Sequence, residues 1–179
     1  MGHPVVTFSG SGSDEDDTFL GDLSTYAELL AWATDRCIPL VREITFSNAE
    51  ELTEEGLPFL ILFHTPEDNE SPKAYRAVIE RELADEKTNV NFLIADGIQF
   101  AHPLHHLGKD KKDLPLIAID SFRHMYLFKD YNKMNDPGEL KRFLADLYSG
   151  KLHREFHYGP SDETPDATPE VNMVTTYWE

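Results

Sequence analysis

Residues 57–64 of this 179-residue chain read LPFLILFH, an apolar run bounded by proline and by polar residues. A short continuous run of this kind is typical of a strand buried on both faces of a sheet. Three further segments favour strands: 40–46 (LVREITF), 90–98 (VNFLIADGI) and 114–120 (LPLIAID). We therefore expect a sheet whose central strands are covered by helices on both sides.

Segments with helical spacing alternate with these strands, and each opens on a capping residue. The signals are Thr25 with Glu28, Ser47 with Glu50, Ser71 before Pro72, and Asp136 before Pro137. Between the last two, a short helix and a basic loop are expected over 100–112. Residues 125–128 follow the fourth strand after only four residues, which predicts an antiparallel hairpin.

The expected order is therefore β-α-β-α-β-α-β-β-α, an α/β arrangement with parallel βαβ units and a terminal hairpin. This is the order of a thioredoxin-like fold. In that architecture a proline, often in cis, begins the fourth strand, and Pro115 stands at that position.

Composition excludes several classes of protein. The chain holds 16 Lys and Arg against 33 Asp and Glu, a net charge of −17, which argues against nucleic-acid binding. No apolar run is long enough for a membrane span. The start shows no signal peptide, and the final residues TYWE are not a retrieval tetrapeptide.

More than half of the charge lies at the two ends. Residues 1–17 hold four acidic side chains, residues 161–179 hold five, and neither end contains Lys or Arg. The first end is rich in Gly and Ser, and the second in Pro, so neither can bury enough apolar surface to offset the entropy of ordering. Both are predicted to be disordered acidic tails.

The single cysteine, Cys37, cannot form an intramolecular disulfide or a Cys-x-x-Cys pair. Thioredoxin enzymes carry that pair after the central strand, where this chain reads HTPEDNE at 64–70. Its three carboxylates would disfavour a thiolate. We expect a non-catalytic domain in which Cys37 is structural or unpaired, or else forms an intermolecular disulfide.

Eight histidines are the main candidates for chemistry. His153 and His157 are four residues apart, which on a helix is ligand spacing for zinc, although Arg154 replaces the glutamate of the metallopeptidase motif. His102, His105 and His106 form a second group. The alternative interpretation is that both groups are solvated surface histidines without a ligand. The same holds for the basic loop 109–112.

Four segments carry a resemblance to a known family. They are 37–46 (CIPLVREITF), 51–64 (ELTEEGLPFLILFH), 117–126 (IAIDSFRHMY) and 149–157 (SGKLHREFH). Together they closely resemble non-catalytic parts of a thioredoxin-fold retention chaperone in the protein disulfide isomerase family. The family also has a catalytic domain, and the resemblance implies that these segments lie outside it.

The resemblance implies a division of the chain. Residues 18–39 would be the last helix of a preceding thioredoxin-like domain. Residues 40–148 would be a redox-inactive thioredoxin-like domain, and 149–179 the start of a regulatory tail. The sequence would then be a fragment, a partial gene model or a shortened isoform. A disulfide of the family's third domain would be absent, because Gly97 and Leu114 occupy its positions.

The resemblance also implies a function in the lumen of the endoplasmic reticulum and the intermediate compartment. The family binds client secretory proteins and endoplasmic reticulum oxidases for quality control and retrieval, under control of pH and zinc. Its zinc-binding histidines match His124, His153 and His157. Two alternatives remain: a thiol-disulfide oxidoreductase or isomerase in full-length form, and a purely structural spacer.

Overall fold

The computed structural model describes residues 4–9 and 17–160. The chain divides into two compact units, Met1–Pro39 and Leu40–Glu179. Among the described helices, none has the length and apolar character to cross a bilayer.

The first unit contains helix α1 (Tyr26–Cys37) and a two-stranded antiparallel ribbon of β1 (Thr7–Phe8) and β2 (Asp17–Thr18). The ribbon lies where the composition predicted disorder for 1–17. Backbone pairing of residues 7–8 with 17–18, extended by a hydrogen bond from the Phe19 amide to the Val6 carbonyl at 2.9 Å, forms this ribbon. Residues 10–16 between them, like the predicted acidic tail 161–179, lie outside the described residues.

The second unit is built on a five-stranded sheet in the order β3-β5-β4-β6-β7. Its strands are β3 (Val41–Glu43), β4 (Phe59–His64), β5 (Asn91–Asp96), β6 (Leu116–Asp120) and β7 (Met125–Leu127). The first three pair in parallel, and β6 runs antiparallel to both β4 and β7. The thioredoxin-like fold is therefore confirmed, and the Leu114–Pro115 bond is cis as expected.

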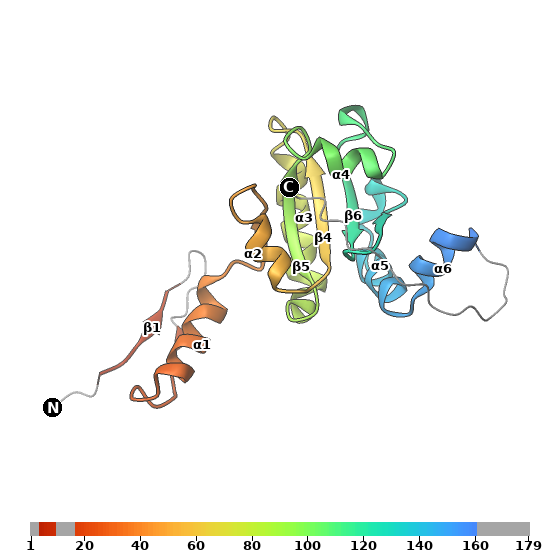
Figure 1. Cartoon of the computed structure of the whole chain (residues 1–179). Coiled ribbons are helices and arrows are strands. Elements are labelled where there is room, and N and C mark those ends of the chain that lie inside the picture. The colour runs from red at the N-terminus through yellow and green to blue at the C-terminus, as the bar shows by residue number, and fades with distance from the viewer. Residues whose placement is uncertain (1–3, 10–16, 161–179) are drawn as a thin grey trace. The chain divides into compact units, whose positions relative to one another are not determined.

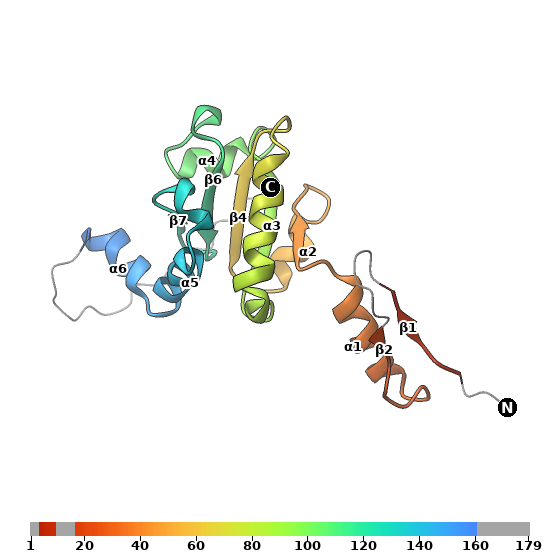
Figure 2. The same cartoon turned by 180° about the vertical axis from the view of Figure 1, so that it is seen from behind.

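Helices cover both faces of this sheet (Figures 1 and 2). They are α2 (Ala49–Glu54), α3 (Glu70–Glu82), α4 (Ala101–His106) and α5 (Glu139–Tyr148). A further helix, α6 (Lys151–Tyr158), follows α5 and has no buried residue. Short 3₁₀ turns are η1 (Ala84–Glu86), η2 (Lys111–Asp113) and η3 (Tyr131–Asn135). Side chains of α3 and α5 share one apolar core with the sheet, and α2 and α4 share the other.

The predicted N-cap of α1, Thr25, is confirmed, whereas the predicted N-caps of α2, α3 and α5 are wrong by one or two residues. Helix α3 begins at Glu70 and not after Ser71, because the Asp68 carboxylate accepts the amides of both residues at 3.1 and 3.0 Å. Helix α5 begins after Gly138, whose φ of 81° turns the chain, and not after Asp136. A glycine that adopts positive φ at little cost thus replaces the expected cap.

Gly97 and Leu114 lie next to each other in the fold. A Cβ atom built on Gly97 would lie 2.6 Å from Cδ1 of Leu114 and 3.3 Å from Cδ1 of Leu104. The Leu114 side chain therefore occupies the space that a side chain at position 97 would need.

Candidate metal centre

Three histidines from two distant segments meet at one edge of the second unit. His124 stands between β6 and β7, and His153 and His157 stand on α6. Their ring centroids lie 5.2 Å (His124–His153), 5.0 Å (His124–His157) and 4.6 Å (His153–His157) apart. Each ring offers one nitrogen, and the three nitrogens lie within 4.8 Å of one another.

A tight turn fixes the position of His124. The Ser121 amide and hydroxyl both donate to the His124 carbonyl, at 3.1 and 3.0 Å. Phe122 has a φ of 63°, and its amide donates to the buried carboxylate of Asp120 at 2.8 Å. These bonds hold the hairpin closed and leave the His124 ring at the surface, where α6 passes.

Helix α6 is held over this hairpin mainly by surface contacts, because none of its residues is fully buried. Leu152 packs against the core from one side. The Phe156 ring stacks at 4.5 Å on the ring of His124. Two ion pairs add to this, Lys151 with Asp146 at 3.2 Å and Lys129 with Glu155 at 3.9 Å.

The environment favours neutral imidazoles at this site. Burial lowers the pKa of His124, and the neighbouring positive charges of His157, His153 and Arg123 lower it further. Burial also lowers the pKa of His153, again assisted by His157 and Arg123. Because zinc binds the neutral ring, these effects favour the form of the side chain that a metal requires.

The distance between one pair of these nitrogens matches that between two ligands of a tetrahedral metal. The Nε2 atoms of His124 and His157 lie 3.3 Å apart. Two ligands placed about 2.0–2.1 Å from a tetrahedral zinc are themselves separated by about 3.3–3.4 Å. Three histidine nitrogens would complete three corners and leave the fourth open to water or to a group from a partner.

The structure does not bring the second predicted histidine group into such an arrangement. His102 and His106 on α4 face each other at 4.8 Å between centroids, and His105 lies beside them. Within the described residues, these three are not among the sets whose ligand atoms converge. Cys37 is exposed at the end of α1, in the first unit.

The segment where thioredoxin enzymes carry their cysteine pair has a structural role here. His64 ends β4, and its Nδ1 lies 3.0 Å from the Asp68 carbonyl oxygen. Asp68 in turn caps α3, and the hydrogen bonds from Ser71 and Glu70 outweigh burial and lower the pKa of its carboxyl. No thiol stands in this segment.

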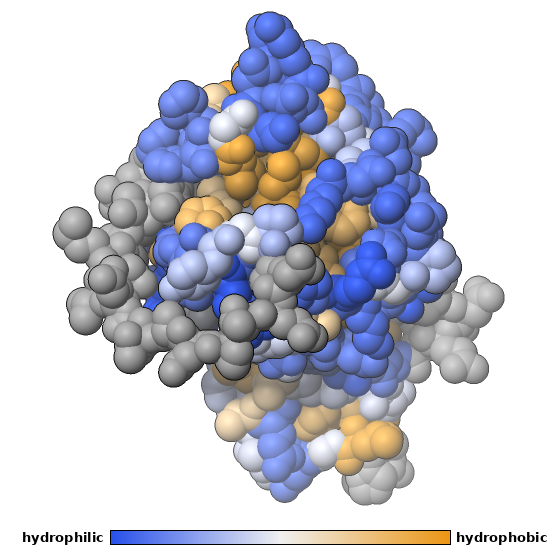
Figure 3. Space-filling view, turned by 90° about the vertical axis from the view of Figure 1, so that its right-hand side faces the viewer, coloured by the Kyte–Doolittle hydropathy of each residue, from blue (hydrophilic) through white to orange (hydrophobic). Residues whose placement is uncertain are grey.

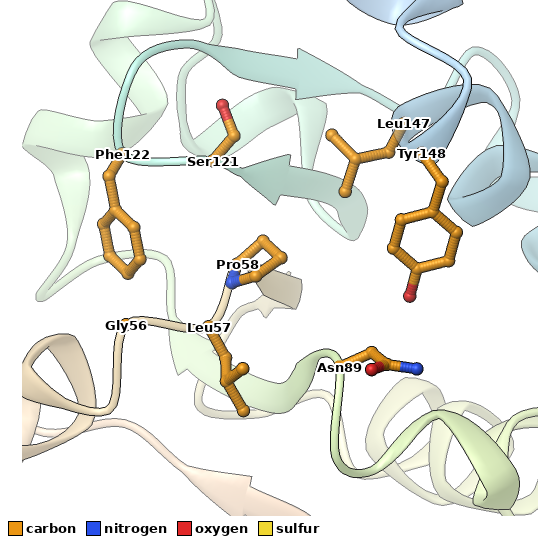
Figure 4. A pocket seen from close by; sticks show the side chains of 8 residues that line it. All are labelled: Gly56, Leu57, Pro58, Asn89, Ser121, Phe122, Leu147 and Tyr148. Atoms are coloured by element: carbon orange, nitrogen blue, oxygen red, sulfur yellow. The ribbon is translucent and has the colours of Figure 1, made fainter.

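The structure has a recess near the β6–β7 hairpin that was not predicted from the sequence. It measures about 600 Å³. Its lining residues are Gly56, Leu57, Pro58, Asn89, Ser121, Phe122, Leu147 and Tyr148 (Figure 4). The Tyr148 hydroxyl donates to the Glu86 carboxylate at 2.8 Å, and burial together with this carboxylate raises the pKa of Tyr148. Residues from three loops and from the end of α5 form it, so no local pattern could have indicated it.

Comparison with known proteins gives consistent matches. The thioredoxin-like domain family matches residues 2–146. The chain is 54% identical over 175 residues to endoplasmic reticulum resident protein 44 of Bos taurus. The alignment covers 98% of this chain and 43% of that protein. It is 53% identical over 152 residues to endoplasmic reticulum resident protein 44.2 of Caenorhabditis elegans. That alignment covers 85% of this chain and 37% of the relative.

A solved structure of human ERp44 in its zinc-bound form matches with a TM-score of 0.74 and 53% identity. The match covers 87% of this chain and 45% of that one. The chain thus spans less than half the length of the curated relatives that it matches.

Proposed function

The chain belongs to the thioredoxin-like domain family and is similar over most of its length to endoplasmic reticulum resident protein 44; from this we propose that it is a redox-silent binding domain of the endoplasmic reticulum lumen that holds zinc at His124, His153 and His157. The observation that carries the zinc proposal is the convergence of three imidazole nitrogens within 4.8 Å.

The zinc site would work as a pH-sensitive element. Zinc would bind the three neutral imidazoles and join α6 to the β6–β7 hairpin. Protonation in more acidic compartments would release it. A human protein to which the chain is similar has a solved zinc-bound form, which supports the proposal.

The partners we propose are client secretory proteins and endoplasmic reticulum oxidases, bound for quality control and retrieval in the early secretory pathway. Such binding would not use a Cys-x-x-Cys pair, because the chain has only one cysteine. A thiol-dependent activity would belong to a longer form. A structural spacer without a ligand is the competing proposal, and zinc binding distinguishes the two.

Zinc titration calorimetry tests the proposal. We expect the wild-type chain to bind one zinc tightly above pH 7, and His153→Ala to lose that binding. His102→Ala is the matched control, because His102 also belongs to an i, i+4 pair, with ring centroids 4.8 Å apart against 4.6 Å for His153 and His157. The control should keep the tight site.

Absence of zinc binding by the wild type above pH 7 would favour the spacer. Equal loss of affinity in both variants would also contradict the assignment, since it would mean that the metal does not depend on the three convergent histidines.

A further inference from the structure

A second recess lies on α4, apart from the three histidines. It measures about 680 Å³. The residues Gly97, Ile98, Ala101 and Leu104 supply its apolar part. The residues His102, His105, Lys109, Asp110, Lys111 and Lys112 supply its polar part. Figure 3 shows one face of the molecule, on which apolar side chains gather between hydrophilic ones.

Two of the four apolar residues of this recess, Ile98 and Ala101, are exposed to solvent. Ile98 is 48% exposed although it follows the buried strand β5, and Leu104 beneath it is buried in the core. Ile98 is held there by a turn, because its amide donates to Asp96 Oδ1 at 2.8 Å. Ile98 therefore offers exposed apolar surface at the recess.

The border of the recess is positively charged in a chain that is otherwise strongly acidic. Lys111 and Lys112 are exposed, and no ion pair holds them or Lys109 within the part of the chain that the structure describes. The two acidic side chains of the loop accept hydrogen bonds from backbone amides. Asp110 accepts the Lys112 amide at 2.7 Å, and Asp113 accepts the Asp110 amide at 3.0 Å. These hydrogen bonds fix the loop, and the ammonium groups of Lys109, Lys111 and Lys112 remain available to a ligand.

We propose that this recess binds a short acidic peptide segment of a partner protein, with carboxylates on Lys109, Lys111 and Lys112 and one apolar side chain against Ile98. Charge complementarity favours an acidic ligand, and the apolar floor favours a peptide over a bare anion. A long polyanion such as RNA is disfavoured, because the net charge of −17 would repel every part outside the recess. The site needs no zinc, and its residues lie outside the three-histidine cluster.

The test uses the full chain in a chelating buffer, so that its outcome is independent of the zinc proposal. The probe is a fluorescein-labelled peptide, Gly-Asp-Glu-Asp-Leu-Glu-Asp-Gly, followed by anisotropy. A second peptide carries Gln and Asn in place of its acids, and a third carries Gly in place of Leu. We expect the first to bind and the other two to bind several-fold more weakly.

The decisive variant is Lys111→Glu with Lys112→Glu. Each exposed ion pair contributes roughly a two- to fivefold factor to affinity, so removing two and adding repulsion should weaken binding about tenfold or more. The matched control is Lys73→Glu with Lys133→Glu, which changes the net charge equally at exposed positions outside the recess. It should change affinity by less than about twofold, because at ~0.15 M salt exposed charges beyond a Debye length of about 8 Å are screened. Ile98→Ser should weaken binding of the leucine peptide and leave the glycine peptide unaffected.

Three outcomes would overturn the proposal. The wild type could fail to bind the acidic peptide at millimolar concentration. The two charge-reversal variants could lose affinity equally, which would indicate a general charge effect. The peptide without leucine could bind as well as the parent peptide, which would indicate an anion site without peptide recognition.

Discussion

The zinc affinity of the three-histidine site should fall between pH 7.2 and pH 6.0. Each imidazole must be neutral to bind the metal, so protons compete with zinc at every ligand. Because burial and nearby positive charge lower the pKa values of His124 and His153, these two rings compete less with protons than free histidine would.

The size of the effect can be bounded from the number of ligands. An ordinary imidazole with a pKa of about 6.5 loses a factor of about 3.5 in its neutral fraction over this interval. Three such ligands would weaken zinc binding about 40-fold, and a single one about 3.5-fold. The lowered pKa values of His124 and His153 place the expected weakening between these limits.

Competition with a zinc-binding indicator at the two pH values measures this ratio, after correction for the indicator's own titration. His153→Ala should bind weakly at both values. A wild-type dissociation constant that changes less than about twofold would refute the reasoning, since even one ordinary histidine ligand gives more. A change well above 40-fold would imply further titrating ligands.

Three other predictions concern the fold and the missing redox chemistry. Gly97→Ala should lower the free energy of unfolding by about 1 kcal/mol in urea titration, because its Cβ would lie 2.6 Å from Leu114 Cδ1 and would force the Leu114 side chain to shift. An unchanged midpoint would contradict this packing. The Arg42 hydrogen bond lowers the pKa of the Glu55 carboxyl against the opposing effect of burial, so stability from this pair is present above the unfolded pKa and is lost as the pH falls through the folded one. Glu55→Gln should therefore flatten the loss of stability between pH 6 and pH 3.5 in urea titrations, and a parallel profile would exclude this contribution. In an insulin-reduction assay the chain should give no turnover, and measurable turnover would overturn the redox-silent assignment.

Much of the second unit could be predicted from sequence because its strands are buried on both faces. The run at 57–64 contains β4 (Phe59–His64), whose side chains from Phe59 to Phe63 are inaccessible to solvent. Such runs carry an unambiguous signal, and the short connection before residues 125–128 correctly indicated the hairpin. The helix starts were harder, because the competition between Asp68 and Ser71 for the cap of α3 depends on the path of the preceding loop.

The metal centre was only half predictable from residue spacing. His153 and His157 are an i, i+4 pair, and a helix necessarily brings them together. His124 is 29 residues from the nearer of them, and only the tertiary fold closes that distance; its assignment came from a family resemblance and not from any local pattern. The ribbon of β1 and β2 was missed because two-residue strands leave no periodicity to detect.

A crystal structure of the chain grown with zinc near pH 7.5, with anomalous diffraction recorded at the zinc edge, tests the central proposal most directly. The account predicts a single strong anomalous peak about 2.0–2.1 Å from one nitrogen of each of His124, His153 and His157. It also predicts an ordered water or other oxygen, nitrogen or sulfur ligand at the fourth corner. A peak elsewhere with none between these three rings would contradict it.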